Sequence, residues 1–110
     1  MMNQKVNNTD FGLKVSEIDK INKVFASYPE INEVILYGSR AKGNYKPGSD
    51  IDLSLKGNKL THQLLNKISN HIDDLLLPYI CELSIYHQID NPALLAHINR
   101  VGKVFYKKKT

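Results

Sequence analysis

Two strand-like segments on either side of a glycine-rich turn constrain the fold of this chain most strongly. Residues 31–37 end in the near-continuous apolar run VILY, which is typical of a strand covered on both faces by helices. In residues 51–55, apolar and polar residues alternate, as expected of a strand with one apolar and one polar face. The intervening residues 38–50 contain three glycines and one proline, which predict a short helical turn followed by a loop.

Three amphipathic helices and two further strands complete the predicted elements. Ser16 is the expected cap of the first helix, and Pro29 is expected to stop it. The helices are predicted over residues 16–28, 60–76 and 91–101, and the strands over residues 80–87 and 104–106. The order αβαβαβαβ predicts an α/β or α+β fold, with a small mixed β-sheet flanked by helices.

The length of 110 residues fits one domain with one core. Residues 1–12 are predominantly polar and are predicted to form a flexible lead-in, residues 13–106 the folded domain, and residues 107–110 a basic tail. The net charge of +4 is mild, and a short lysine tail is usually solvated. Direct binding to nucleic acid is therefore not expected.

The location is expected to be the cytoplasm. The single cysteine, Cys81, excludes an intrachain disulfide and a multi-cysteine zinc site, and it fits a reducing compartment. The N-terminal residues do not read as a secretory signal, and no apolar stretch approaches the roughly 18 residues of a membrane span. No membrane association is expected.

Asp50 and Asp52 form the candidate catalytic pair. Side chains two residues apart on a strand point to the same face, about 6.5–7 Å apart. Two such carboxylates repel each other and are costly to desolvate, and Mg²⁺ removes both costs because it binds carboxylates together with substrate phosphates. The pattern is short and common, and the alternative is that Asp50 ends a loop while Asp52 faces solvent.

The turn at Gly38 and Ser39 adds a candidate phosphate site. Glycine lets the backbone approach a ligand closely, the following turn can aim N–H groups at phosphate oxygens, and Ser39 adds a hydroxyl. The segment is not a Walker A loop, because Asn44 stands where the lysine is required. A phosphate turn after one strand and a carboxylate pair at the next suggest a bound nucleoside triphosphate.

The composite pattern resembles the signature of the DNA polymerase β-like nucleotidyltransferase superfamily. Gly38-Ser39, ten intervening residues and then Asp-Ile-Asp match that signature. The stretches LYGSRAKG at 36–43 and SDIDL at 49–53 look more closely like the minimal nucleotidyltransferase (MNT) branch, which includes antitoxins of the MntA type. The resemblance covers about residues 31–106 and implies the nucleotidyltransferase fold with ATP as substrate.

The resemblance also implies roles for the matching residues. Gly38 and Ser39 would bind the β- and γ-phosphates, and Asp50 and Asp52 would hold two Mg²⁺ ions. A third carboxylate is expected on the next strand, where Glu82 is the only candidate. Minimal members usually carry aspartate there. The longer glutamate departs from that pattern in the third catalytic and metal-binding position.

The remaining candidates are basic, hydroxyl-bearing and aromatic residues near the motif, together with the histidines. Arg40 matches a basic position of the minimal family and would steady the triphosphate, and Ser49 would contribute to nucleotide binding. Lys42 would act like Arg40 or remain an exposed charge. Tyr37 is expected in the core. The four histidines show no metal-ligand spacing and are expected at the surface or its boundary: His62, His71, His87 and His97.

The family implies a two-component function. No residues are left over for an acceptor-binding domain, so the acceptor is expected on another molecule, a HEPN-domain RNase toxin, in a hetero-oligomer. The chain would then be an adenylyltransferase antitoxin that transfers AMP from ATP to a tyrosine of the toxin. One alternative is a non-catalytic module in which Glu82 impairs the second metal site. The other is a small-molecule nucleotidyltransferase whose acceptor pocket is completed by another subunit.

Overall fold

A four-stranded mixed sheet forms the centre of the molecule. The computed structural model describes residues 9–109. The strand order is β5-β4-β3-β6, with β3 antiparallel to both β4 and β6 and β4 parallel to β5. The strands span Glu33–Tyr37 (β3), Ile51–Lys56 (β4), Cys81–Ile85 (β5) and Lys103–Lys107 (β6). A mixed sheet flanked by helices was predicted, and this class is confirmed.

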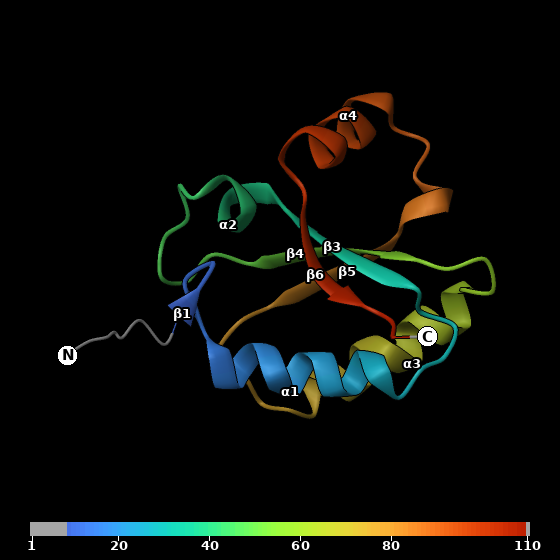
Figure 1. Cartoon of the computed structure of the whole chain (residues 1–110), viewed down its shortest axis with the longest axis horizontal. Coiled ribbons are helices and arrows are strands. Elements are labelled where there is room, and N and C mark those ends of the chain that lie inside the picture. The colour runs from blue at the N-terminus through green and yellow to red at the C-terminus, as the bar shows by residue number, and fades with distance from the viewer. Residues whose placement is uncertain (1–8, 110) are drawn as a thin grey trace.

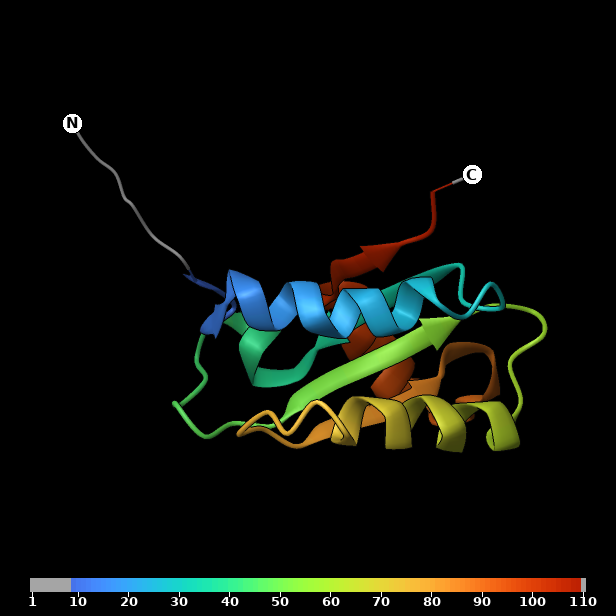
Figure 2. The ribbon, with the colours of Figure 1, turned by 90° about the horizontal axis from the view of Figure 1, so that it is seen from below.

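Two long helices cover one face of this sheet, and a third lies on the opposite side (Figure 1). The helices α1 (Val15–Ala26) and α3 (His62–Asp73) run next to each other, as the turned view in Figure 2 also shows. Helix α4 (Pro92–Val101) contacts β3 and the short helix α2 (Gly38–Lys42), which follows β3 directly. A 3₁₀ turn, η1 (Tyr86–Gln88), follows β5.

The hydrophobic core lies between the sheet and the pair α1 and α3. Alternate residues of β3 and β4 point into it, so Val34, Leu36 and Leu53 are fully buried. Their neighbours point to the opposite face, which is only partly covered. Tyr37 is half-buried on this opposite face, so its predicted place in the core is wrong. Side chains along β3 point alternately to the two faces of the sheet, and the continuous apolar run VILY does not indicate which of them point away from the core.

A small hairpin starts ahead of residue 13, where the folded domain was predicted to begin. Residues 1–8 of the predicted lead-in lie outside the described residues, whereas β1 (Thr9–Asp10) pairs with β2 (Leu13–Lys14) as a small hairpin. This hairpin leads directly into α1. The amide of Lys14 donates to Glu17 Oε1 at 2.9 Å, while Ser16 already lies within the helix. The predicted capping role of Ser16 is therefore wrong.

The predicted basic tail is partly joined to the sheet. Lys107 is the last residue of β6, and the amide of Lys108 donates to the carbonyl of Asn32 at 2.9 Å. The ammonium of Lys108 also donates to the carbonyl of Pro29 at 3.0 Å. These contacts fix the end of β6 beside the start of β3.

Among the described residues, no helix has the length and apolar character required to cross a bilayer.

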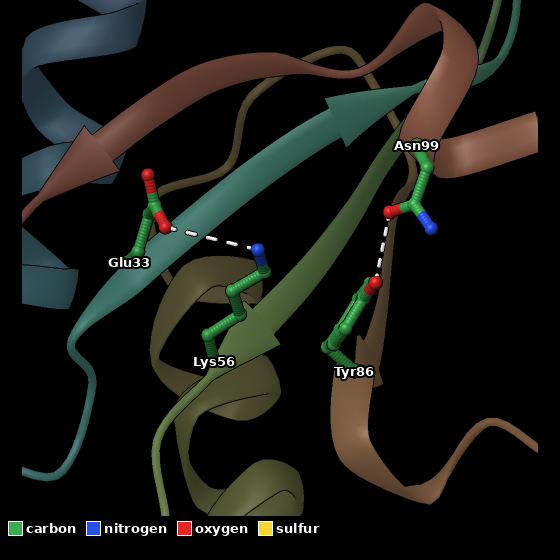
Figure 3. A network of polar contacts seen from close by, with 4 residues as sticks. All are labelled: Glu33, Lys56, Tyr86 and Asn99. Atoms are coloured by element: carbon green, nitrogen blue, oxygen red, sulfur yellow. Dashed lines mark hydrogen bonds and ion pairs between the residues drawn. The ribbon is translucent and has the colours of Figure 1, made fainter. Parts of the chain in front are cut away.

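A polar network closes the far end of the sheet face opposite the core (Figure 3). Lys56 and Glu33 form an ion pair with an N–O distance of 3.9 Å, and the Lys56 ammonium lies 4.6 Å from the centre of the Tyr86 ring. The Tyr86 hydroxyl donates to Asn99 Oδ1 of α4 at 2.8 Å. Exposed ion pairs contribute at most about 1 kcal/mol. The network therefore serves mainly to connect α4 with the end of β5.

Candidate active site

Strand register brings the predicted acidic residues to one end of the sheet. Asp52 of β4 is paired with Tyr37 of β3 on one side and with Glu82 of β5 on the other. Paired residues on adjacent strands share a face, so the three form a row on the face opposite the core. Asp50 precedes Asp52 by two residues at the entrance to β4. The carboxylates that the sequence pattern selected therefore gather at one edge of this face.

Gly38 is required both by backbone conformation and by space. It directly follows β3, and its φ of +73° lies in the left-handed region. A Cβ at this position would overlap with Oδ2 of Asp52. The turn and the Asp52 carboxylate are therefore in direct contact, as expected of a site that combines phosphates with a metal ion.

Replacement of Gly38 by alanine is expected to disturb this contact. An L-residue in the left-handed region costs about 1–2 kcal/mol, and the new methyl group must also displace the Asp52 carboxylate. Gly43→Ala is the matched control, because Gly43 has a φ of +89° but no atom within 4 Å of the added Cβ. Thermal unfolding should show a loss for Gly38→Ala at least as large as that for Gly43→Ala, whereas calorimetry should show weakened Mg-ATP binding only for Gly38→Ala. Equal binding by the two variants would contradict the assignment of the turn to the site.

The carboxylates at this end of the sheet raise the pKa values of neighbouring acidic groups. Burial, followed by the charge of Asp50, raises the pKa of Asp52. Burial also raises the pKa of the Tyr37 phenol; a hydrogen bond with Ser84 opposes this, and the charges of Asp52 and Glu82 add to it. The Tyr37 hydroxyl therefore lies within the electrostatic reach of both carboxylates and is held in its neutral form.

The carboxylates at this end of the sheet fit the way in which proteins bind a magnesium ion. Among residues 9–109, no three histidine, cysteine, aspartate or glutamate side chains converge as a ready-made metal cage. Mg²⁺ does not require one, because it usually binds one or two protein carboxylates and completes its shell with water and substrate phosphates. Asp50 and Asp52 interact electrostatically and fit this mode. The role of Glu82 as a third ligand stays a prediction.

Arg40 has a structural role in place of the predicted contact with the triphosphate. Its side chain is 1% exposed. Its guanidinium donates to the carbonyls of Phe11 at 2.9 Å, Pro47 at 3.2 Å and Ser49 at 2.9 and 3.1 Å. Because these bonds engage the buried guanidinium within the protein, the predicted contact between Arg40 and the triphosphate is wrong. Arg40 instead fastens the loop before Asp50 to α2 and to the N-terminal hairpin.

The other predicted binding residues lie around the same loop. The Ser49 hydroxyl accepts a hydrogen bond from the amide of Lys46 at 2.8 Å and closes the turn that precedes Asp50. Ser39 is the second residue of α2 and is half-buried, and Lys42 is exposed at the end of that helix. The nucleotide contacts assigned to Ser39 and Ser49 stay predictions.

Cys81, next to Glu82, is not a candidate nucleophile. Burial, with a further contribution from the charge of Asp73, raises the pKa of its thiol to about 11. At neutral pH the group is therefore a thiol, and only a thiolate would attack a phosphoryl group or bind a metal. The residue is partly buried and packs against the core.

His97 is the residue near the site that sequence reasoning missed. Its Nε2 accepts a hydrogen bond from the Gly38 amide at 3.2 Å, and its ring meets that of Tyr37 edge to face at a centroid distance of 6.1 Å. A lone histidine without ligand spacing gave no reason to select it. One signal was present, because His97 lies three residues after Leu94 and four before Val101, on the apolar stripe of its helix.

Comparison with known proteins identifies the family. A family model described as "Polymerase beta, Nucleotidyltransferase" matches residues 19–110, and the chain therefore belongs to this nucleotidyltransferase family. A comparison with curated protein sequences gave no match. The fold and the Gly38–Asp52 arrangement thus lie within a family whose members transfer nucleotides.

Several solved structures share the fold. A chain of the "toxin-antitoxin with AMP-PNP" is 19% identical, with a TM-score of 0.68 over 84% of this chain and 74% of that one. A chain of the "tri-AMPylated Shewanella oneidensis HEPN toxin in complex with MNT antitoxin" is 17% identical, with a TM-score of 0.64 over 86% and 72%. A chain of the "toxin-antitoxin MntA-HepT" is 16% identical, with a TM-score of 0.64 over 86% and 74%. At these identities the likeness establishes the fold.

Proposed function

We propose that this protein is a Mg²⁺-dependent adenylyltransferase antitoxin that transfers AMP from ATP to a tyrosine of a partner HEPN-domain RNase toxin. The observation that carries the proposal is the contact between the Gly38 turn and the Asp52 carboxylate, within a row that continues to Glu82. The likeness in fold to toxin–antitoxin complexes supports the choice of partner. The proposed location of this protein is the cytoplasm, where it would meet the toxin.

The chain's own residues would bind and orient the nucleotide. The turn at Gly38 and Ser39 would receive the β- and γ-phosphates, and Asp50 and Asp52 would hold Mg²⁺ together with them. When bound, the metal ions would offset the negative charge on the phosphates and on the leaving pyrophosphate. The acceptor hydroxyl would give up its proton to a carboxylate or to water and form a bond to the α-phosphorus, while the bond from that phosphorus to the oxygen that bridges it to the β-phosphorus breaks and pyrophosphate leaves. Glu82, exposed at the end of the row, is the carboxylate that would face this acceptor.

Glu82 provides the sharpest test of catalysis. We expect Glu82→Gln to reduce transfer at least about a hundredfold, because an amide can neither accept the proton of the acceptor hydroxyl nor replace a carboxylate as a ligand for Mg²⁺, and Glu82→Asp to retain a larger part. The assay follows label from α-³²P-ATP onto a HEPN-domain RNase supplied as the candidate partner. γ-³²P-ATP provides the control for phosphorylation, and Asp19→Asn, on an exposed site of α1, is the matched control variant.

A non-catalytic antitoxin is the second candidate, and it is favoured by the glutamate at position 82, where minimal members of the family usually carry aspartate. In that case, Glu82→Gln and the wild type would neutralise the toxin equally while the toxin stays unlabelled. Transfer of label to a small molecule in the absence of a protein partner would instead support the third reading, a small-molecule nucleotidyltransferase.

A further inference from the structure

The amide of Gly38 is held by a histidine from a distant part of the chain. Gly38 is the first residue of α2, and the first amides of a helix have no partner within the helix. Here the amide donates to Nε2 of His97, 59 residues further along, at 3.2 Å. Because a backbone amide only donates, Nε2 must be the unprotonated nitrogen, and the ring proton of the neutral imidazole then lies on Nδ1.

The position of His97 is itself fixed by the fold. The edge of the Tyr37 ring packs against the imidazole, with an interplanar angle of 82°. At the end of α4, Gly102 allows close packing, because a Cβ there would overlap with Ile35 Cγ2 and with the carbonyl oxygen of Ile98. The hydrogen bond between Tyr86 and Asn99 connects the same helix to the end of β5. Helix α4 therefore presents His97 to the turn from a defined position.

We propose that His97 is a positioning residue that fixes the peptide between Tyr37 and Gly38 in the orientation required for nucleotide binding. The inference rests on the proposed function for its consequence, although not for its geometry. Without an acceptor at Nε2, the Gly38 amide loses this hydrogen bond, and glycine itself restricts rotation of the peptide very little. Rotation would move Gly38 against the Asp52 carboxylate and shift Ser39 at the start of α2. His97 thereby couples α4 both to the turn at Gly38 and Ser39 and to the Asp52 carboxylate.

This arrangement also refines the expected role of Gly38. Its amide is engaged by His97 in this structure, so Gly38 contributes its conformation and its lack of a side chain. The phosphate contact assigned to the turn then falls to Ser39. His97 acts through Gly38 and is expected to affect nucleotide binding more than the chemical step.

The test compares His97→Ala with His97→Gln, whose side-chain oxygen can replace Nε2 as the acceptor. Hydrogen exchange of the Gly38 amide, followed by NMR, should be about tenfold faster in His97→Ala and return toward the wild-type rate in His97→Gln. The dissociation constant of Mg-ATP and its KM should rise up to about tenfold in His97→Ala, with kcat little changed. His87→Ala, at an exposed histidine of η1, is the matched control.

Two readouts separate failure of this inference from failure of the proposed function. If the wild type binds no nucleotide, the proposed function fails, and Gly38 exchange alone decides the positioning role. Fast exchange in His97→Ala with recovery in His97→Gln supports that role, and equal exchange in all variants overturns it. If the wild type binds Mg-ATP and His97→Ala binds it equally well, the inference is overturned, whatever the exchange rates. Thermal unfolding of each variant identifies a general loss of structure, and the Gln variant then provides the comparison.

Discussion

The replacement of Arg40 by alanine is expected to lower the free energy of unfolding by about 3 kcal/mol. The guanidinium is buried and donates to three backbone carbonyls, those of Phe11, Pro47 and Ser49. Each carbonyl that loses its donor inside the protein costs about 1–3 kcal/mol, partly offset because the buried charge is removed as well. The faces of two tyrosine rings also lose their cation, with guanidinium-to-ring distances of 5.2 and 5.0 Å: Tyr45 and Tyr79.

Urea unfolding measures this effect through the midpoint of the transition, with the m-value checked for a change in the denatured state. Lys42→Ala is the matched control, because Lys42 is an exposed cation on the same short helix, and its removal should change stability by less than about 0.5 kcal/mol. Arg40→Lys should fall between the two, since an ammonium cannot reach all three carbonyls. Similar stability of the Arg40 and Lys42 alanine variants would contradict the structural role.

The replacement of Asp52 by asparagine is expected to abolish transfer while stabilising the protein without ligands. A metal ion supplies several kcal/mol of transition-state stabilisation, and each 1.36 kcal/mol is a factor of ten. The loss of its ligand should therefore reduce the rate about a thousandfold or more. The same carboxylate is costly in the free protein, because burial and the charge of Asp50 raise its pKa. Asparagine keeps the shape without the charge.

The pH dependence of this stability difference has a defined sign. Because the pKa of Asp52 is raised on folding, its favourable contribution to stability is fully present below the unfolded pKa, where the group is protonated. The contribution is lost as the pH rises through the folded value. The Tm of Asp52→Asn should therefore exceed that of the wild type by a few degrees near neutral pH and by less in acid. A lower Tm at neutral pH, or retained transfer, would contradict this account.

The fold and the acidic pair could be predicted because they depend on local pattern. The alternation around Ile51 and Leu53 sets which face of β4 is buried, and this face is the same whichever neighbour β4 has. The spacing of Asp50 and Asp52 then fixes their shared face. Glu82 could be assigned only as the acidic residue of the next strand. Its position opposite Asp52 depends on the parallel register of β4 and β5, which the sequence does not reveal.

The roles of Arg40 and His97 depend on contacts between distant segments. A charged residue in a glycine-rich turn, such as Arg40, is expected to face solvent or a ligand. One acceptor of Arg40 is the carbonyl of Phe11, which belongs to a hairpin in a segment that the sequence predicted to be a flexible polar lead-in. His97 lies on a helix whose placement against α2 follows from the return of the chain into β6. The sequence carries the periodicity that turns His97 inward, although it does not indicate that Gly38 is the residue it meets.

The most direct test of the central claim is the intact mass and peptide mapping of a HEPN-domain RNase supplied as the candidate partner. That protein is incubated with this chain, ATP and Mg²⁺, and its RNase activity is measured in parallel. We predict the added mass of one or more AMP groups on a tyrosine, accompanied by loss of RNase activity, and neither change with Asp52→Asn. An unmodified HEPN protein that is nevertheless inhibited in a stable complex, equally with the wild type and with Asp52→Asn, would contradict the adenylyltransferase assignment.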